Sequence, residues 1–324
     1  MKFSPDQEQE DFARALDALL SSADTVAAAR AWAGDDFGPG SKLWRRVAGL
    51  GVTALLIPEE SNGIGGTLVD VAVVFERLGY HGIPGPWIES AVFLPALLND
   101  SSETSLRTRL AEGLIATSSE PDASRALDVR AADCAFTVTG NRMFRAQRTD
   151  DMTSVDPVRR LGAVEPGEPV CELDAATVIR AFDAASLACA SMLLGAGQRL
   201  LADTVAYVLQ RRQFGRVVGG YQAVKHMLAD VEVSLDFTRP LVIGAAHEWT
   251  ANSTTVSRDV SAAKVAAGNA AYLAARAALQ LHGAVAYTLE LDVSMWILRV
   301  QALETAWGTS AYHRGRIAAA LREG

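Results

Sequence analysis

The sequence has few of the features that define several large classes of proteins. Its 324 residues include only three cysteines, Cys134, Cys171 and Cys189, and these are scattered along the chain. Their spacing fits neither a zinc site nor a disulfide framework, and it suits a reducing compartment. No uninterrupted apolar run reaches the roughly 20 residues that a membrane-spanning helix needs. The acidic start, MKFSPDQEQEDF, also lacks an apolar signal core. We therefore expect a cytoplasmic protein with no membrane span.

Basic residues are also fewer than acidic residues in this sequence. The chain has 30 lysines and arginines against 38 aspartates and glutamates, for a net charge of -8. This balance argues against nucleic acid as the main partner. The glycine-rich loop SNGIGG at 61–66 is not followed by Lys and Ser or Thr, which excludes a phosphate-binding P-loop there. With 49% hydrophobic residues, the chain has an ordinary globular composition, and its length predicts two or three domains.

The region 1–113 is expected to form an N-terminal helical domain. Ser4 is a suitable N-cap for a first helix, with proline at the first helical position after it. Apolar residues at helical spacing predict further helices from Ser41 to a stop at Gly51, from Leu68 to a stop at Gly79, and over the apolar stretch WIESAVFLPALL.

The region 114–182 has the pattern of a reduced β domain. Short β-prone runs separated by turn residues are expected to form strands. They occur in GLIATSSEP, in DVRAADCAFTVTGNRMFRAQ, in VRRLGAV and in EPVCEL. These strands are too few for a complete barrel or sandwich.

The region 183–324 is expected to form a C-terminal four-helix bundle, because long alanine-rich segments alternate with short loops. Asp183 lies near the predicted start of the first bundle helix, at about Ala184, where it would cap that helix or complement its dipole. Pro240 is expected to kink the second helix. His226 and His313 lie on amphipathic segments and are interpreted as structural or interfacial. The fold class is thus mainly α, with a small β segment between two helical parts.

A cationic turn lies inside this bundle, within LQRRQFGRVVGGYQAVKHMLAD at Leu209–Asp230. Arg211 offers a planar fork suited to phosphate, and Phe214 offers a flat face on which a ring can stack. Taken alone, the turn indicates only a possible anion site. Arginines that complement the negative end of a helix dipole are the simpler and favoured explanation of such a short motif.

The same turn closely resembles the RxQFG…Q signature of the acyl-CoA dehydrogenase family. A second turn, Gln280-Leu281-His282-Gly283-Ala284-Val285-Ala286, resembles the family's Q-x-x-G-G-x-G turn, with alanine in place of two glycines. The N-terminal pattern is similar to the family as well, which implies a mainly helical acyl-CoA dehydrogenase fold. The resemblance also implies FAD as cofactor, an acyl-CoA substrate and an electron-transfer flavoprotein as acceptor. It assigns the adenosine-diphosphate end of FAD to Arg211, Gln213, Phe214, Gln222, Gln280 and Gly283.

The family's catalytic base is missing from its two known positions. The segment that matches Y-E-G-T reads Ala306-Trp307-Gly308-Thr309, which places glycine where the carboxylate belongs. The alternative base position on the first bundle helix aligns with Ala185 and Ser186. Glu304 is one helical turn before Gly308 and is retained as a weak base candidate. A solvated or salt-bridged surface glutamate is the favoured explanation of that residue.

The sequence also departs from the family pattern in the β segment. The family's T-E-P-x-A-G-S-D loop, which helps to bind flavin, is represented by SEPDASR, with Arg125 in place of the serine. The Trp-x-Thr contact reads Met143-Phe144-Arg145-Ala146. The chain thus keeps the residues that serve the adenosine-diphosphate end and loses most of those that serve the flavin ring.

This asymmetric loss predicts that the chain is a subunit that contributes half of a flavin site, and that a different, catalytic subunit contributes the other half. The chain resembles the smaller subunit of the α2β2 acyl-CoA dehydrogenases of actinobacterial steroid and cholesterol side-chain degradation. Its expected partner is a larger subunit that carries the catalytic glutamate. Two alternatives stay open: a self-sufficient homo-oligomer with Glu304 as base, and a flavin-free scaffolding relative.

Overall fold

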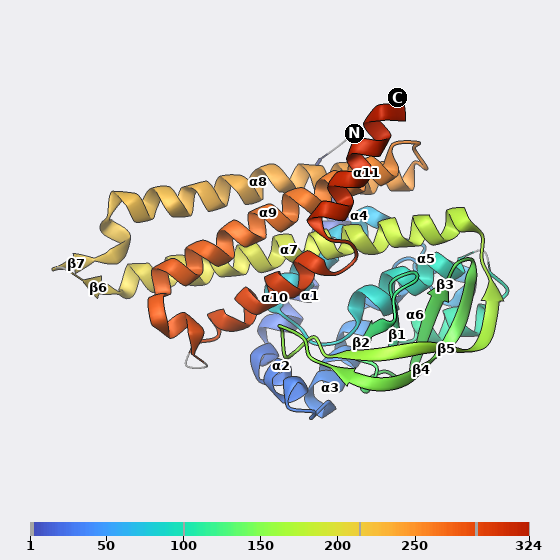
Figure 1. Ribbon diagram of the computed structural model, residues 1–324. Helices are drawn as coiled ribbons and strands as arrows, with labels where there is room; N and C mark the ends of the chain where they lie inside the picture. Colours follow the sequence, from blue (N-terminus) through green and yellow to red (C-terminus); the bar gives the residue numbers. More distant parts are fainter. Residues whose placement is uncertain (1–2, 100, 214, 289–290, 324) are drawn as a thin grey trace.

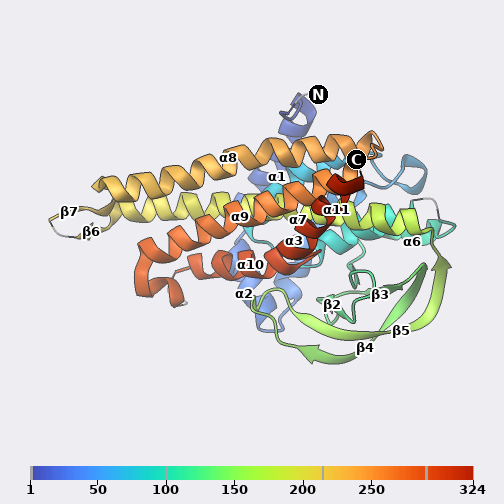
Figure 2. The ribbon, with the colours of Figure 1, turned by 45° about the horizontal axis from the view of Figure 1, so that its top comes forward.

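The computed structural model describes residues 3–99, 101–213, 215–288 and 291–323. Three long helices lie side by side and form the body of the molecule (Figures 1 and 2). The N-terminal helices pack against this body, and a small sheet lies near one end of it. The opposite end of the body carries the turn between the first two long helices and the turn that follows the third.

The N-terminal part is helical, as expected, although several of its helix ends differ from the prediction. The helix expected from Ser41 to a stop at Gly51 spans Gly38–Ala48. The first helix is capped by Asp6, in a capping box with Gln9, and not by Ser4. The helix that starts at Leu68 does not stop at Gly79 but continues to His81, and Gly82 at φ +62° ends it. The helices are α1 (Gln7–Ser21), α2 (Thr25–Ala33), α3 (Gly38–Ala48), α4 (Leu68–His81), α5 (Leu94–Leu98) and α6 (Thr104–Ala111), with a π-helical turn at Glu89–Phe93.

Gly79 serves the packing of α4 against α7 (Ala175–Gln210). A β-carbon on Gly79 would lie 2.1 Å from the carbonyl oxygen of Met192, and one on Gly195 would lie 1.8 Å from that of Glu76. Two backbones that approach so closely leave no space for any side chain. Gly79 and Gly195 therefore mark the place where α4 and α7 cross, and Gly79 is not a helix end.

The β segment forms a five-stranded sheet in the order β1-β3-β4-β5-β2, in which only β1 and β3 are parallel. A single bridge between Ser119 and Ala126 joins its two edges, so the sheet curls without closing into a full barrel. The two runs expected as separate strands, VRRLGAV and EPVCEL, contribute to one irregular strand, and β2 was not predicted. The strands are β1 (Ala116–Ser118), β2 (Arg125–Leu127), β3 (Cys134–Thr139), β4 (Arg142–Met152) and β5 (Leu161–Glu172).

The C-terminal helices form the bundle. Its first helix begins at Ala175, earlier than predicted, and the second continues through Pro240 without a break. By length and composition α7 could cross a membrane, but 83% of its most apolar window is buried inside the molecule, as in a core helix. The helices are α7 (Ala175–Gln210), α8 (Gln222–Thr250), α9 (Val256–His282), α10 (Val293–Thr305) and α11 (Ser310–Glu323).

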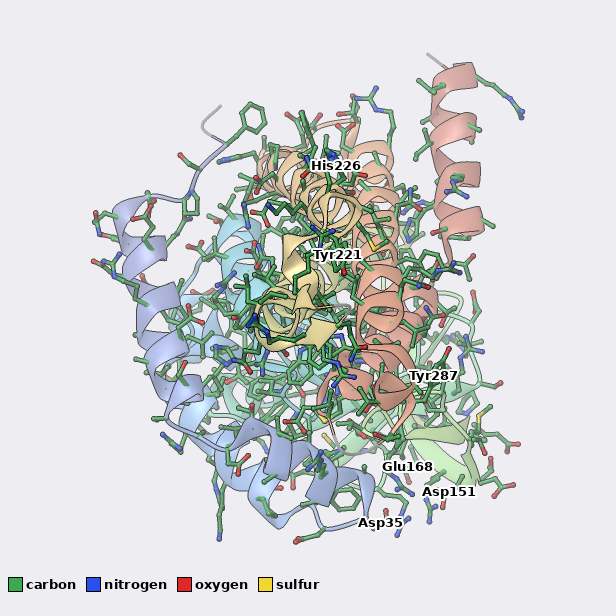
Figure 3. The ribbon with its side chains drawn as sticks, turned by 90° about the vertical axis from the view of Figure 1, so that its left-hand side faces the viewer. Asp35, Asp151, Glu168, Tyr221, His226 and Tyr287 are labelled. Atoms are coloured by element: carbon green, nitrogen blue, oxygen red, sulfur yellow. The ribbon has the colours of Figure 1, made fainter. Side chains whose placement is uncertain are left out.

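Asp183 and His313 tie these helices together. Asp183 does not cap α7 but lies buried within it, where it pairs with Arg316 at 2.7 Å and accepts a hydrogen bond from Ser257. His313 is fully buried between the Ser261 hydroxyl at 3.0 Å and the Trp307 carbonyl oxygen at 2.9 Å. This position agrees with a structural role for His313. His226 is exposed on α8, at the end of the bundle that Figure 3 faces.

Candidate functional site

The turn between α7 and α8 is a short β-hairpin made of β6 (Arg212–Gln213) and β7 (Arg216–Val217). The carbonyl oxygen of Arg211 accepts a hydrogen bond from Val218 at 2.8 Å, and the Arg216 guanidinium lies over the Tyr221 ring at 3.6 Å. Gly215 allows the reversal with φ +79°. Phe214, one of the predicted cofactor residues, lies outside the described residues. The hairpin holds the backbone in place while its polar side chains stay available.

The predicted cofactor side chains on this turn are exposed. Arg211, Gln213 and Gln222 are open to solvent, and none of their side chains makes a hydrogen bond or ion pair with another described residue. Arginine and glutamine in such positions can approach an anionic ligand from outside without breaking an internal contact. At this end of the bundle the structure therefore provides donors that have no acceptor among the described residues.

The second predicted turn lies at the same end of the bundle. The Tyr207 ring, near the end of α7, stacks on the His282 ring at 4.2 Å, and the Tyr207 carbonyl oxygen accepts the Arg211 amide. Figure 3 looks onto this end, with Tyr221 and Tyr287 on the two turns. Gln280 is exposed, and Gly283 has φ +69° with nothing within 4 Å of the place where a β-carbon would lie. The two turns are thus brought together by the fold.

Gln280 and Gly283 also line a broad groove of about 1220 Å³ on α8 and α9. Large apolar side chains are exposed in and beside this groove: Tyr272 is 41%, Leu273 39%, Tyr287 78% and Phe237 74% exposed. Exposed apolar surface of this extent is typical of a protein–protein contact.

The segment that matches the family's base position lies far from this end, after α10. Trp307 and Gly308 both have positive φ, +54° and +92°. The Trp307 ring is buried against Phe93 at 4.8 Å, and its amide donates to Glu120 at 2.7 Å. Ser186, at the second base position, is buried and donates to the Trp307 carbonyl oxygen at 3.1 Å. Among the described residues, no carboxylate takes the place of a family base at either position.

Glu304, the weak base candidate, points elsewhere. Its Cγ lies 3.8 Å from the β-carbon position of Gly268 on α9, while Ala302 and Thr305 of the same helix face the cavities on the sheet side. Glu304 lines neither of those cavities. Its location on the helix therefore does not favour a role as base.

A small polar cavity lies beside Trp307, between the sheet and the bundle. Its volume is about 170 Å³, and we call it the inner cavity. Glu89, on the π-helical turn, is 3% exposed, and its Oε2 has no hydrogen-bond partner. Arg159, 9% exposed, lines the same cavity, as do Glu120 and Arg125. π-Helical turns are frequent at functional sites.

Sequence reasoning missed Glu89 and Arg159. The one available signal was a glutamate inside the apolar stretch WIESAVFLPALL, which was interpreted only as a buried helix. Burial raises the pKa of Glu89, while Arg159 and the Trp307 hydrogen bond oppose that shift, and Glu120 adds to it. Desolvation is the largest of these effects, so the neutral form of Glu89 is favoured relative to a carboxyl in water.

The described residues fit one end of an FAD molecule better than the other. The exposed donors and the open glycine at the two turns suit a pyrophosphate and an adenosine group. The inner cavity is close in size to an engineered cavity of roughly 150 Å³ that holds benzene, so by itself it is too small for a tricyclic flavin ring.

Comparisons with known proteins identify the class to which this fold and these turns belong. The family model for the acyl-CoA dehydrogenase N-terminal domain matches residues 6–114, and the model for the C-terminal domain matches residues 175–322. The chain belongs to the acyl-CoA dehydrogenase family, whose cofactor is FAD. Other structures of this fold were solved with FAD bound.

Particular relatives are similar over nearly the whole chain. Acyl-CoA dehydrogenase IpdE2 of Mycobacterium tuberculosis is 32% identical over 302 residues, which cover 91% of this chain and 92% of IpdE2. The ChsE4-ChsE5 complex from Mycobacterium tuberculosis has a TM-score of 0.84 at 21% identity, with full coverage of both chains. The Tcur3481-Tcur3483 steroid ACAD G363A variant has a TM-score of 0.84 at 20% identity, with 98% of each chain covered. At these identities the two structures establish the fold.

Proposed function

We propose that this chain is a subunit of a heteromeric FAD-dependent acyl-CoA dehydrogenase and contributes the adenosine-diphosphate half of the flavin site. One observation carries this proposal: the two parts of the expected site lie far apart along α7. Arg211 follows the last residue of that helix, whereas Ser186, in its first third, hydrogen-bonds the Trp307 carbonyl oxygen beside Gly308. At 1.5 Å per residue, these two positions are roughly 37 Å apart.

A single FAD cannot bridge that length within one chain. The retained set at the hairpin end therefore serves a flavin whose ring lies in another subunit. At the other end the family's base is absent, and Trp307 fills the space beside its position. The partner in this proposal is a larger acyl-CoA dehydrogenase subunit that supplies the catalytic glutamate. The exposed apolar groove on α8 and α9 offers it a surface.

The reaction would be the α,β-dehydrogenation of an acyl-CoA, with electrons passed from FAD to an electron-transfer flavoprotein. FAD supplies the redox chemistry when bound, and this chain's residues bind and orient it. A steroid side-chain CoA thioester is the proposed substrate class, supported by the steroid ACAD whose structure shares this fold.

The test is to express the chain alone and with a full-length family member, and to measure flavin content. We expect little FAD in the chain alone and bound FAD in the complex. Arg211→Ala and Gln280→Ala should each reduce the FAD content of the purified complex without dissociating the subunits. Arg142→Ala, which removes another exposed arginine, on β4, is the matched control and should leave the FAD content unchanged.

Two outcomes would reject the proposal in favour of the alternatives. Stoichiometric FAD and acyl-CoA turnover by the chain alone would indicate a self-sufficient homo-oligomer. If the complex is stable and neither Arg211→Ala nor Gln280→Ala changes its FAD content, the chain is a scaffolding subunit that does not contact flavin.

A further inference from the structure

The inner cavity holds two buried polar groups that the proposed function does not use. Oε2 of Glu89 has no hydrogen-bond partner. The Arg159 guanidinium makes no ion pair or hydrogen bond with another described residue, although it is close enough to Glu89 to affect its pKa. Leaving a buried polar group unsatisfied destabilises the folded state, and more so if the group is charged. The orphaned Glu89 oxygen and the unpaired Arg159 guanidinium on one cavity indicate that something other than the described residues satisfies them.

The charges around the cavity favour an anion. Arg159 and Arg125 contribute two positive charges, and Glu120 contributes one negative charge, with its Oε1 already engaged by the Trp307 amide. Burial raises the pKa of Glu89, which disfavours its negative charge relative to a carboxyl in water. Neither guanidinium has a hydrogen-bond or ion-pair partner among the described residues, so the two arginines favour an anionic ligand.

A second space lies beside the inner cavity. This outer groove has a volume of about 460 Å³ and shares Glu120, Arg125 and Thr305 with the inner cavity. Much of its remaining lining is apolar, from Val178, Ile179, Phe182 and Tyr312, and Asp122 and Arg316 also line it. Ile179 is 53% exposed and Tyr312 51% exposed, so the groove is open at its outer side. A polar chamber behind an apolar mouth suits an amphipathic ligand.

We propose that the inner cavity binds the carboxylate of a small organic acid and that the outer groove holds the apolar part of that acid. The planar fork of Arg159 pairs with the two carboxylate oxygens, and the neutral carboxyl of Glu89 donates a hydrogen bond to one of them. The outer groove, with a volume of about 460 Å³, has room for an apolar body such as a single ring or a short chain. Benzoate is a suitable probe.

The size and polarity of the two spaces separate this ligand from simpler anions. Inorganic phosphate or acetate would satisfy Arg159 but would leave the apolar outer groove filled with water. An acid with an apolar body gains further affinity because binding removes the surface of that body from water. Benzoate is therefore expected to bind at least tenfold more tightly than acetate.

To test the proposal, the purified full chain is titrated with benzoate, acetate and phosphate, and calorimetry measures the dissociation constant of each. Arg159→Met should abolish benzoate binding. Glu89→Gln, whose amide still donates a hydrogen bond, should keep the affinity within about threefold, whereas Glu89→Ala should weaken it about tenfold. Arg142→Met, an exposed arginine on β4, is the control and should leave the affinity unchanged.

Arg159 is buried, so its removal can also disturb folding. If Arg159→Met does not fold, Arg159→Lys takes its place; it keeps the charge but loses the fork and should weaken benzoate binding about tenfold. Unchanged affinity in the folded variant, or phosphate bound as tightly as benzoate, would overturn the proposal. Because this test needs neither FAD nor a partner subunit, its result is independent of the heteromer proposal.

Discussion

A β-carbon on Gly308 would lie 2.6 Å from Nε2 of His313. His313 cannot easily move away, because that nitrogen is hydrogen-bonded to the Trp307 carbonyl oxygen and the ring is fully buried. A side chain at position 308 would also have to adopt φ +92°, where residues other than glycine are strained. The family's base position in this chain is therefore closed to any side chain, and not merely occupied by a neutral residue.

Gly308→Glu should destabilise the chain without creating a base. Positive φ costs about 1–2 kcal/mol, and the clash with His313 adds about 1–3 kcal/mol. Urea denaturation should show a loss of about 2–5 kcal/mol. Gly315→Ala is the matched control: nothing lies within 4 Å of its β-carbon position on α11, so alanine should stabilise by about 0.5–1 kcal/mol. Equal effects of the two changes would contradict this explanation.

Asp128 should make stability fall as pH rises. Its carboxyl is buried, accepts a hydrogen bond from the Trp32 indole at 3.0 Å, and has one unsatisfied oxygen. Desolvation raises its pKa from 3.8 to about 7. Between these values the folded chain keeps a proton that the unfolded chain has released, so unfolding becomes easier with increasing pH. The full effect is about 4 kcal/mol, since each pKa unit is worth about 1.4 kcal/mol.

Asp128→Asn tests this dependence. Asparagine tolerates the φ of +52° at this position and keeps an acceptor for Trp32. The variant should be more stable than the unmodified chain at pH 8, and the difference should shrink towards pH 4. A difference that is independent of pH would show that Asp128 does not titrate in this range.

Arg299 and Asp156 form a buried ion pair, and a substitution that removes only one partner should strongly destabilise the folded chain. Arg299 is 3% exposed on α10, and Asp156 lies fully buried before β5. Arg299→Met leaves an unpaired buried carboxylate and should cost about 3–5 kcal/mol by urea denaturation. The double variant Arg299→Met with Asp156→Asn should recover part of that loss. Additive losses would mean that the pair has no coupling energy.

Glu304→Gln should leave catalysis intact in the complex with the partner subunit. The Glu304 side chain faces α9 and lines neither the inner cavity nor the outer groove. Reduction of bound FAD by an acyl-CoA, followed by absorbance, should therefore keep its rate within about twofold. A loss of tenfold or more at unchanged flavin content would restore Glu304 as the base.

Much of the molecule was predictable from local patterns. Helical periodicity and alanine content located the helices, and two short turns indicated the family, because those features depend on residues close together in sequence. The helix ends were less predictable. The local sequence around Gly79 predicts a helix end, but the close packing of α4 against α7 is what requires glycine there. Asp183 is likewise predicted to cap a helix, whereas in the structure it pairs with Arg316 of the last helix.

The sequence by itself determined the helical class and the family, and it suggested the residues that we propose for the nucleotide end of FAD. Only the tertiary structure decided which residues share a site. It brought Glu89 and Arg159 onto one cavity from distant parts of the chain, and it placed Arg211 at the end of α7 away from Gly308. The physical reason is that spacing along the chain sets local conformation, whereas burial, charge neighbours and close backbone approach arise only when separate elements pack.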